Sequence, residues 1–564
     1  MKSLIFTAVV CLAASSFAQI SLPTIKITSN GEPVTTTVPP NQANCFVGCV
    51  KIMDYVSMAN FELKDPNNSR NDITVVPENN GGESDSIRVR GNSTALPEYK
   101  KKAYRIKFDK KQSLFGRPAA KSWNLLANYY DQTFALNAIA FRLGKKIMPG
   151  FTPSSEFVHL YLNGQYKGIY QLTEQIQDGL GRVDIDKQKG FLVEFDFRDL
   201  ESDQVGFSAP SPYTTMKNVR VRSPELGGCD IRPLTNCSIS NDTVKFVQTE
   251  INAMFSAVQT GTNHWNLMDV DSWARYVLIQ QVIDNLDFNS GTDAAGGYPP
   301  GSNYAYKDAG SKIFAGPLWD FDLAASVSMS NYPKHFYRTS EPIKPKNVFY
   351  QKLWDDNQFR CKFKEAWTDN KSFFETIPAF IDSISEVLAP HAQANFTTGL
   401  YETTSSYKPT IPKTEAEYKT EVGKLKTWWN SRMTFFNTEV NNLSASSCVK
   451  SPSSSSAAPS SSSTMPSSSS ATPSSSSNVA SSSSSASTSA IPIKAEPSAI
   501  VLQNVPEDAK IEIYSLQGKR IYSRDAMHRV STRGKLQIPV QTKGIYIVKV
   551  SFGSEKRIFK VSVR

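Results

Sequence analysis

The feature that most constrains this chain is the segment from Ser451 to about Ser489, which is almost entirely Ser, Ala, Pro and Thr. Blocks of consecutive serines alternate there with prolines. Such a segment cannot bury enough apolar surface to offset the entropy lost on folding, which predicts a disordered, extended linker. We therefore expect a linker over residues 451–490, a large folded domain over 19–450 and a small one over 491–564.

The first 18 residues have the pattern of a secretory signal. Lys2 precedes an apolar run from Leu4 to Ala14, and Ser16 and Ala18 occupy the small-residue positions of a cleavage site. The run is too short to cross about 30 Å of hydrocarbon, and no later stretch approaches the length of a membrane helix. Residues 1–18 are predicted to be a signal peptide, so the mature protein is expected to be secreted or displayed on the cell surface without a transmembrane segment.

Six cysteines remain after removal of this segment, and an even number in an exported chain predicts disulfide bonds. The pairing that closes the least chain is Cys45–Cys49, Cys229–Cys237 and Cys361–Cys448, although the sequence allows others. Half a zinc site at Cys45 and Cys49 is the rival interpretation, but no second Cys/His pair with ligand spacing follows.

The part after the linker is dense in alternating segments that are typical of short strands. Three of them are Ile511–Tyr514, Gly544–Val550 and Arg557–Val563, and Gly-containing turns separate them. The pattern predicts a small antiparallel β-sandwich. From residue 491 onward we count 14 Lys/Arg and 6 Asp/Glu, a net charge of +8 out of +10 for the chain. This charge suits a solvated basic face or contact with an anionic envelope or receptor; nothing points to nucleic acid.

Three motifs in this region, IEIYSLQGKRIYS, GIYIVKV and the final KRIFKVSVR, resemble the C-terminal sorting domains of the type IX secretion system. The resemblance implies a second export step across an outer membrane, with the secretion machinery as partner. An ordinary appended β-module is the alternative.

Residues 19–450 divide by pattern into two lobes. The lobe up to about residue 195 is rich in strands, interrupted by one helix from about Asp131 to Lys146. The later lobe is mostly helical, with helices at about 243–258, 270–284, 357–368, 371–387 and 414–441. A strand pair at about 303–307 and 312–322 lies between them. These patterns predict an α+β, two-lobed arrangement.

The sharpest local feature is Trp319-Asp320-Phe321-Asp322. On a strand, residues i and i+2 face the same side, so Asp320 and Asp322 would present two carboxylates together. Two adjacent carboxylates repel each other unless a cation lies between them, and hard oxygen ligands suit Mg²⁺, Mn²⁺ or Ca²⁺. An exposed acidic turn is the alternative interpretation.

Upstream, Asp284-Asn285-Leu286-Asp287 ends an apolar helix, and Asn303 begins a predicted strand. An acid at a helix end, an amide on the next strand and the paired acids beyond it form the minimal set for metal-assisted phosphoryl transfer. Helix capping by Asn285 or Asp287 is the alternative.

The β-rich part offers candidate contacts to phosphate. The turn Arg90-Gly91-Asn92-Ser93-Thr94 has the small residues that allow close approach to a phosphate. On the strand that follows Lys100, the cations Lys102 and Lys107 are candidates for pinning a nucleotide phosphate, provided that an acid holds them. A solvated strand edge is the commoner role of such lysines.

Several motifs together resemble the spore-coat protein H (CotH) kinase family over about residues 85–325. They are RGNST, KKAYRIKFD, SWNLLANYYDQTFALNAIAFRLG, EFVHLYLNGQYKGIYQLTEQI and GPLWDFDLAAS, in the family's order. The resemblance implies an atypical protein-kinase-like fold that uses ATP and Mg²⁺ or Mn²⁺ to phosphorylate Ser or Thr of secreted proteins.

By position, the resemblance assigns Asp320 as a metal ligand and Asp287 as the catalytic Asp, and Asp322 is expected to join Asp320 at the metal. Asn303 is the second metal ligand, and Lys102 binds phosphate, with Lys107 in reserve. The acidic partner of this lysine is either Asp131 or Glu174, and Asn92 is a further nucleotide contact.

One departure from the family pattern lies between the catalytic acid and the asparagine that follows it. These two residues are only a few positions apart in the family, whereas a Gly/Pro-rich loop from Phe288 to Ser302 separates them here. The loop either folds away or has displaced Asp287, which would leave an inactive relative.

Two other functions remain open from the sequence. A noncatalytic module that binds a polysaccharide or a protein would suit a globule displayed on a serine-rich stalk. Glycoside hydrolysis by Asp287 and Asp320 would need two opposed carboxylates roughly 5–9.5 Å apart.

Overall fold

The computed structural model of the chain describes residues 21–38, 50–77, 84–91, 94–196, 205–213, 218–224, 241–289, 301–325, 339–405, 409–443 and the strand segments between 493 and 563. Contacts divide the chain into two compact units, Met1–Ser454 and Ser455–Arg564. The predicted signal peptide, the serine-rich linker and every predicted disulfide cysteine except Cys361 lie outside the described residues, so these interpretations stay predictions.

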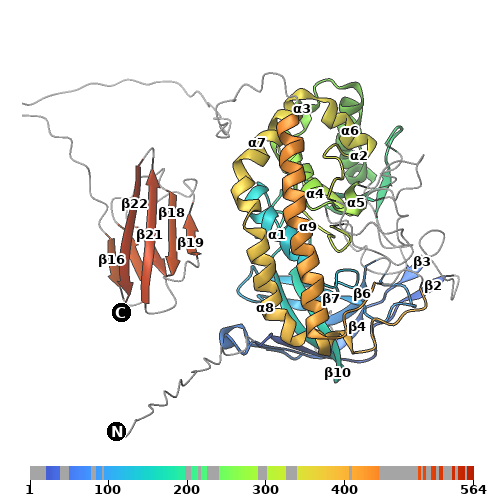
Figure 1. The fold of residues 1–564 in the computed structure, drawn as a ribbon, viewed down its shortest axis with the longest axis vertical. Coiled ribbons are helices and arrows are strands. Elements are labelled where there is room, and N and C mark those ends of the chain that lie inside the picture. The colour runs from blue at the N-terminus through green and yellow to red at the C-terminus, as the bar shows by residue number, and fades with distance from the viewer. Residues whose placement is uncertain are drawn as a thin grey trace, which may run out of the picture. The chain divides into compact units, whose positions relative to one another are not determined.

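The first unit is built on a closed β-barrel (Figure 1). Its strand order is β1-β9-β10-β8-β7-β6-β4, and β1 pairs with both β9 and β4, which closes the ring of seven strands. The strands are β1 Thr24–Ser29, β4 Val56–Lys64, β6 Ser86–Arg90, β7 Ala103–Gln112, β8 Ala120–Leu126, β9 Ser155–Leu162 and β10 Gln165–Glu174. A short strand, β5 (Ile73–Val75), extends the sheet beside β4. Buried aliphatic and aromatic side chains fill the barrel, among them Ile25, Phe61, Ile106 and Trp123.

The predicted two-lobed, kinase-like arrangement is wrong. The strands of the early region close into a barrel instead of forming an open lobe, because β1 pairs in parallel with β9 across more than a hundred intervening residues. Elements of the later region are mixed with those of the earlier one: β11 (Phe191–Asp196) is the central strand of a second sheet, whose other strands all follow it in sequence. The architecture is therefore mixed α/β, with no boundary near residue 195.

The second sheet has the order β12-β13-β11-β14-β15 and is antiparallel. Its remaining strands are β12 Gly206–Ser208, β13 Asn218–Ser223, β14 Asn303–Lys307 and β15 Ile313–Ala315. Along β11, Val193 and Phe195 belong to the main hydrophobic core, whereas Leu192 packs in a separate small cluster with Trp319. This alternation gives the sheet two different faces, of which one packs on the helices.

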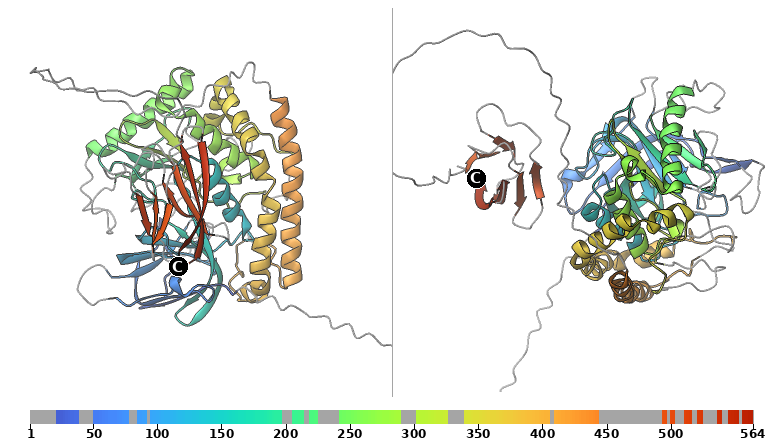
Figure 2. Two further views of the ribbon diagram at one scale, coloured as in Figure 1. Left: turned by 90° about the vertical axis from the view of Figure 1, so that its left-hand side faces the viewer. Right: turned by 90° about the horizontal axis from the view of Figure 1, so that it is seen from above.

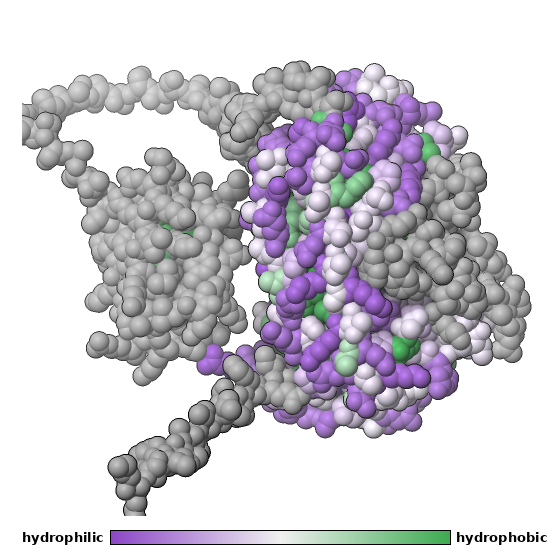
Figure 3. Space-filling view, viewed as in Figure 1, coloured by the Kyte–Doolittle hydropathy of each residue, from purple (hydrophilic) through white to green (hydrophobic). Residues whose placement is uncertain are grey.

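The helices surround the main core, in which the aromatic residues Trp273, Phe349 and Trp429 are fully buried. They are α1 Ala135–Ile147, α2 Asn241–Thr260, α3 His264–Leu267, α4 Val270–Val282, α5 Leu286–Asn289, α6 Val348–Asp355, α7 Asn357–Phe374, α8 Ile377–Phe396 and α9 Glu415–Asn442. Figures 1 and 2 show α8 and α9 side by side along one side of the unit. Their outward surface is mostly hydrophilic (Figure 3), as expected for amphipathic helices that cover a core.

The helix predicted from about Asp131 begins later, at Ala135. Phe134 precedes it in the left-handed conformation, with φ of 59°, and the Asp131 carboxylate accepts hydrogen bonds from the backbone N–H groups of Thr133 and Leu136, both at 2.9 Å. Residues 131–134 therefore form a capping turn, which satisfies N–H groups that a helix start leaves without partners.

The second unit contains two antiparallel sheets in its described segments. One has the order β16-β17-β20 and the other β19-β18-β21-β22. The strands are β16 Ile493–Glu496, β17 Ala499–Leu502, β18 Lys510–Ser515, β19 Arg520–Arg524, β20 Leu536–Pro539, β21 Gly544–Phe552 and β22 Glu555–Val563. Alternating residues such as Ile511 and Ile513 are buried, as the period-two pattern of the sequence predicts.

A search of the described residues for a helix long and apolar enough to cross a bilayer found none.

Candidate functional site

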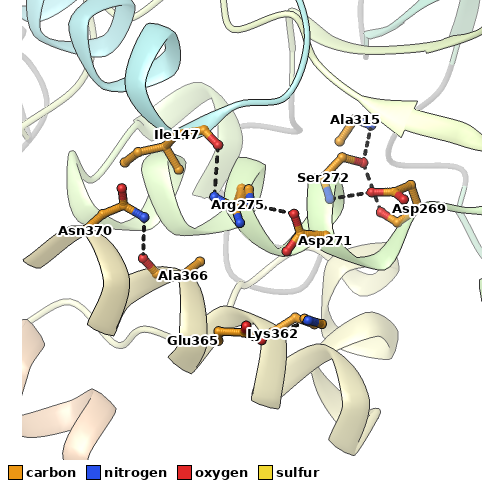
Figure 4. A network of polar contacts seen from close by, with 10 residues as sticks. All are labelled: Ile147, Asp269, Asp271, Ser272, Arg275, Ala315, Lys362, Glu365, Ala366 and Asn370. Atoms are coloured by element: carbon orange, nitrogen blue, oxygen red, sulfur yellow. Dashed lines mark hydrogen bonds and ion pairs between the residues drawn. The ribbon is translucent and has the colours of Figure 1, made fainter. Parts of the chain in front are cut away.

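The helix that leads to the candidate site is fixed at its first turn by a polar network (Figure 4). Asp269 caps α4 by accepting a 2.8 Å hydrogen bond from the Ser272 N–H, and the Ser272 hydroxyl accepts a 3.2 Å bond from the N–H of Ala315 on β15. On the same helix, Arg275 pairs with Asp271 and donates to the carbonyl of Ile147 at the end of α1. These contacts hold α4, α1 and β15 in a fixed relation.

The other end of α4 turns sharply into the segment that carries Asp287. Asp284 has φ of 50°, in the left-handed region that ends helices. The chain that follows is joined to residues 320–325: the N–H of Leu286 donates to the Leu323 carbonyl at 3.4 Å, and the N–H of Ala325 donates to the Ile283 carbonyl at 2.8 Å. Asp287 and Asp322 therefore lie on two adjoining segments.

The Asp320 and Asp322 pair does not lie on a strand, as the sequence analysis expected. Strand β15 ends at Ala315, and Gly316 with φ of 102° and Asp320 with φ of 67° break the extended conformation. The i, i+2 argument for a shared face therefore does not apply. The two carboxylates are nevertheless close enough that Asp320 acts on the ionisation of Asp322.

A buried amide relay fixes this acidic segment to the rest of the unit. The Asn137 side chain on α1 accepts a 3.0 Å hydrogen bond from the Phe321 N–H and donates to the side chain of Asn128, also at 3.0 Å. Asn128 in turn donates to Gln171 on β10 at 3.1 Å. The relay ties the segment between two candidate metal ligands to the barrel, and the sequence analysis missed it.

Three other carboxylates act on Asp322 in this region. The pKa of Asp322 is raised well above its ordinary value, first by burial and then by the negative charges of Asp320, Asp287 and Asp131. Asp131 is itself buried, and burial raises its pKa to about 6 in spite of its hydrogen bonds at the start of α1. The charges of Asp320, Asp287 and Asp131 therefore all reach the Asp322 carboxylate.

Asn303, the predicted second metal ligand, is the first residue of β14 and is buried. Its amide oxygen accepts a 3.0 Å hydrogen bond from the Tyr276 hydroxyl, and its amide nitrogen donates to the Gly301 carbonyl. Gly301 also donates its N–H to the carbonyl of Asp287 at 2.9 Å. The two ends of the sequence insertion are therefore joined beside the acids, whereas residues 290–300 lie outside the described part of the chain.

Asp320 and Asp322 suit a Mg²⁺ site that is completed by water and substrate phosphates better than a site made of protein ligands alone. Among the described residues, no group of three or more His, Cys, Asp or Glu side chains is arranged to hold a metal. Mg²⁺ usually keeps several waters and takes one or two carboxylates together with substrate phosphates. Asp320 and Asp322, with mutually repelling carboxylates, fit that donor set.

The predicted lysine contacts lie elsewhere. The ammonium group of Lys102 donates to the backbone carbonyls of Ala95 and Leu96, and burial lowers its pKa to about 8. Lys107 lies over the ring of Tyr55 at 5.9 Å. Glu174 is buried and accepts a hydrogen bond from the N–H of Ser154. Asn92 lies outside the described residues.

Arg90, which the sequence analysis named only as the first residue of a phosphate-binding turn, lies beside Asp320. The Arg90 guanidinium lies 5.2 Å from the centre of the Trp319 ring, next to Asp320 in the chain. Burial lowers the pKa of Arg90, and the negative charge of Asp320 opposes this shift. Arg88 and Arg90 alternate along β6, which ends at the first residue of the RGNST turn. This alternation was the sequence signal that two cations lie on one face of the strand.

Two family models match the chain. One, for the CotH kinase protein, covers residues 87–436, and the other, for a secretion system C-terminal sorting domain, covers residues 488–564. The first match spans more than half of the chain and includes every described element of the candidate site. No curated protein matches the chain significantly.

Proposed function

This chain belongs to the CotH kinase protein family and ends in a type IX sorting domain, and from that premise we propose that it is a secreted protein kinase. It transfers the γ-phosphoryl group of ATP to Ser or Thr hydroxyls of an extracellular protein. The sorting domain implies secretion or an outer-surface location and interaction with the secretion machinery.

The observation that supports the proposal is that the segment carrying Asp287 is joined to the segment carrying Asp320 and Asp322, next to which Arg90 lies over Trp319. Backbone hydrogen bonds between residues 283–286 and 323–325 join the two acidic segments, and the raised pKa of Asp322 reflects the charges of the other acids. Phosphoryl transfer is catalysed mainly by positioning and by neutralisation of phosphate charge. Carboxylates that hold a metal ion supply part of that neutralisation, and a nearby protein cation supplies the rest.

In the proposed reaction, the Asp287 carboxylate accepts the proton of the acceptor hydroxyl. The hydroxyl oxygen then bonds to the γ-phosphorus, the bond from that phosphorus to the bridging oxygen breaks, and ADP leaves with the electron pair. Asp320, Asp322 and Asn303 are the residues that would hold Mg²⁺ or Mn²⁺, which neutralises phosphate charge when bound. Lys102, Lys107, Glu174 and Asn92 stay predictions as nucleotide contacts.

The test is incorporation of labelled phosphate from ATP into the chain itself or into generic Ser/Thr substrates, with and without Mg²⁺ or Mn²⁺. We expect metal-dependent incorporation that falls at least a hundredfold in Asp287→Asn and in Asp320→Asn. Asp308→Asn, at the exposed β14–β15 turn, is the matched control and should keep its activity. Absence of incorporation, together with no thermal shift with ATP plus metal, would contradict the kinase assignment.

The noncatalytic binding module is the alternative function. The sorting domain favours display outside the cell, where ATP is scarce. Binding to a polysaccharide or protein that needs no nucleotide and survives Asp320→Asn would favour this alternative.

A further inference from the structure

The outer face of the barrel carries a row of arginines that the proposed chemistry has not yet used. On β6 and β7, Ile87, Val89 and Ile106 point into the barrel core. Successive strand residues face opposite sides, so Arg88, Arg90 and Arg105 lie on the outer face. Arg88 and Arg105 are directly opposite each other in the strand register, and Arg90 is two residues farther along.

The guanidinium groups of Arg90 and Arg105 are partly withdrawn from solvent and lie close to other cations. The Nε atoms of Arg90 and Arg105 are inaccessible to solvent and have no hydrogen-bond partner in the described part of the chain. Burial lowers the pKa of Arg105 to about 10, and the positive charges of Arg88, Arg90 and Arg222 lower it further. Buried cations that repel one another are costly unless an anion compensates them.

The nearest carboxylates are already engaged. Glu194 on β11 accepts a 2.8 Å hydrogen bond from Nε of Arg222 and lies 3.8 Å from Nη1 of Arg220. Asp320 accepts a 2.9 Å hydrogen bond from the Ser302 hydroxyl. The negative charges of both acids raise the pKa of Arg90 and so oppose the lowering by burial. The group therefore keeps an excess of positive charge close to the proposed metal ligands.

We propose that Arg90 and Arg105, with Arg88 beside them, bind a condensed phosphate chain, either the triphosphate of a nucleotide or inorganic polyphosphate. Planar guanidinium groups bind phosphate oxygens through paired hydrogen bonds, and several of them in a row match the repeated anionic oxygens of such a chain. The row ends at Arg90, which lies over Trp319 next to Asp320. This assignment deepens the proposed function and rests on it for the orientation of the terminal phosphate toward Asp320.

The arginines would supply phosphate donors in addition to Lys102, which stays a predicted nucleotide contact. Lys102 donates to the carbonyls of Ala95 and Leu96, so its ammonium group already has oxygen partners. The arginines on the outer face of the same two strands supply more donors in a fixed geometry.

The test measures binding of inorganic tripolyphosphate to the full secreted chain without divalent metal, by titration calorimetry and by thermal shift. We expect saturable binding that weakens as salt rises, and a dissociation constant at least tenfold higher in Arg90→Gln and in Arg105→Gln. Arg70→Gln is the matched control, because Arg70 is exposed in the short 3-10 helix Ser69–Asn71 between β4 and β5, and it should change the constant less than twofold. ATP should compete with tripolyphosphate, whereas adenosine should not.

Arg105→Lys is the control for misfolding, because it keeps the positive charge and removes only the paired hydrogen-bond donors. It should retain the circular dichroism spectrum and yet bind at least threefold more weakly. Equal binding by the wild type and both glutamine variants, or binding of ATP without binding of tripolyphosphate, would overturn the assignment.

Failure here and failure of the kinase proposal give different results. If tripolyphosphate binds through the arginines but no phosphate is transferred, the kinase proposal fails and the anion site stands. If phosphate is transferred and neither glutamine variant raises KM for ATP, the anion site fails and the kinase proposal stands.

Discussion

The hydroxyl of Ser302 donates a 2.9 Å hydrogen bond to Oδ2 of Asp320. The two residues are eighteen positions apart, and both have positive φ, 54° for Ser302 and 67° for Asp320. Ser302 is the last residue of the insertion that separates this chain from the family pattern. The insertion therefore supplies a contact that orients a proposed metal ligand.

Removal of this contact should lower activity more than stability. In Ser302→Ala, we expect kcat for phosphate transfer to fall about tenfold with KM for ATP little changed, because one charged hydrogen bond that orients Asp320 is lost. The free energy of unfolding should fall by only about 1 kcal/mol. Ser311→Ala, in the β14–β15 turn, serves as the control. An unchanged kcat in Ser302→Ala would show that the contact does not matter for catalysis.

The amide relay makes a second prediction about the same segment. Asn137→Ala should lower the free energy of unfolding by about 1–3 kcal/mol, because the buried N–H of Phe321 and the Asn128 side chain each lose a partner. Transfer activity should fall as well, since the backbone between Asp320 and Asp322 is no longer fixed. Chemical denaturation and steady-state kinetics measure the two effects. Unfolding that shows no loss of stability in Asn137→Ala would argue against the relay.

A tight contact between the barrel and α8 makes a prediction about stability alone. Gly168 on β10 has φ of +94°, and a Cβ there would lie 2.4 Å from Oδ1 of Asn395 and 2.6 Å from Nζ of Lys101. Gly168→Ala should therefore cost about 2–5 kcal/mol of unfolding free energy through strain and overlap.

Gly164, in the same hairpin, is the matched control for this effect. It also has positive φ, +79°, but a Cβ there would meet nothing within 4 Å. Gly164→Ala should therefore cost only about 1–2 kcal/mol. Equal losses in the two variants, measured by urea unfolding, would show that the contact with α8 contributes nothing.

The ionisation of His159 predicts how stability depends on pH. Burial, followed by the nearby charges of His391 and Lys101, lowers the pKa of His159 from 6.5 to about 4 in the folded chain. The unfolded chain therefore binds the extra proton first as the pH falls from about 6.5 to about 4, so this group makes the protein less stable across that window. Because the ring is only partly buried, we expect a loss of about 1–2 kcal/mol.

The matched variant is His159→Gln, which keeps a polar partner for the Tyr166 hydroxyl but does not titrate. Its unfolding free energy should fall less than that of the wild type between pH 6.5 and pH 4. Parallel pH profiles of the two proteins would exclude His159 as the source of the acid sensitivity.

Local elements of the first unit were predictable because their signals are local. The apolar spacing that predicted a helix over about 270–284 corresponds to α4, Val270–Val282, and the alternation after Lys102 corresponds to β7, Ala103–Gln112. Strand β15 was predicted too long. The reason is that Gly316 and Asp320 adopt positive φ, a choice that depends on the contacts of this segment with Asn137 and Asn285.

The candidate site was only partly predictable for the same reason. The acids Asp287, Asp320 and Asp322 stood out because carboxylates at close spacing are conspicuous in a sequence. Arg90 and Asn137 did not, because their relation to Asp320 and Phe321 arises from contacts between distant parts of the chain.

By itself, the sequence determined which segments have the periodicity of helices and strands, which residues carry charge, and which family and sorting signal the chain matches, because all of these depend on neighbouring residues. The tertiary structure alone decided that β1 pairs with both β4 and β9 to close a barrel. It alone also decided that Arg90 of β6 lies near Trp319 and Asp320. Those arrangements depend on packing and on strand pairing between residues far apart in the chain, for which no local pattern exists.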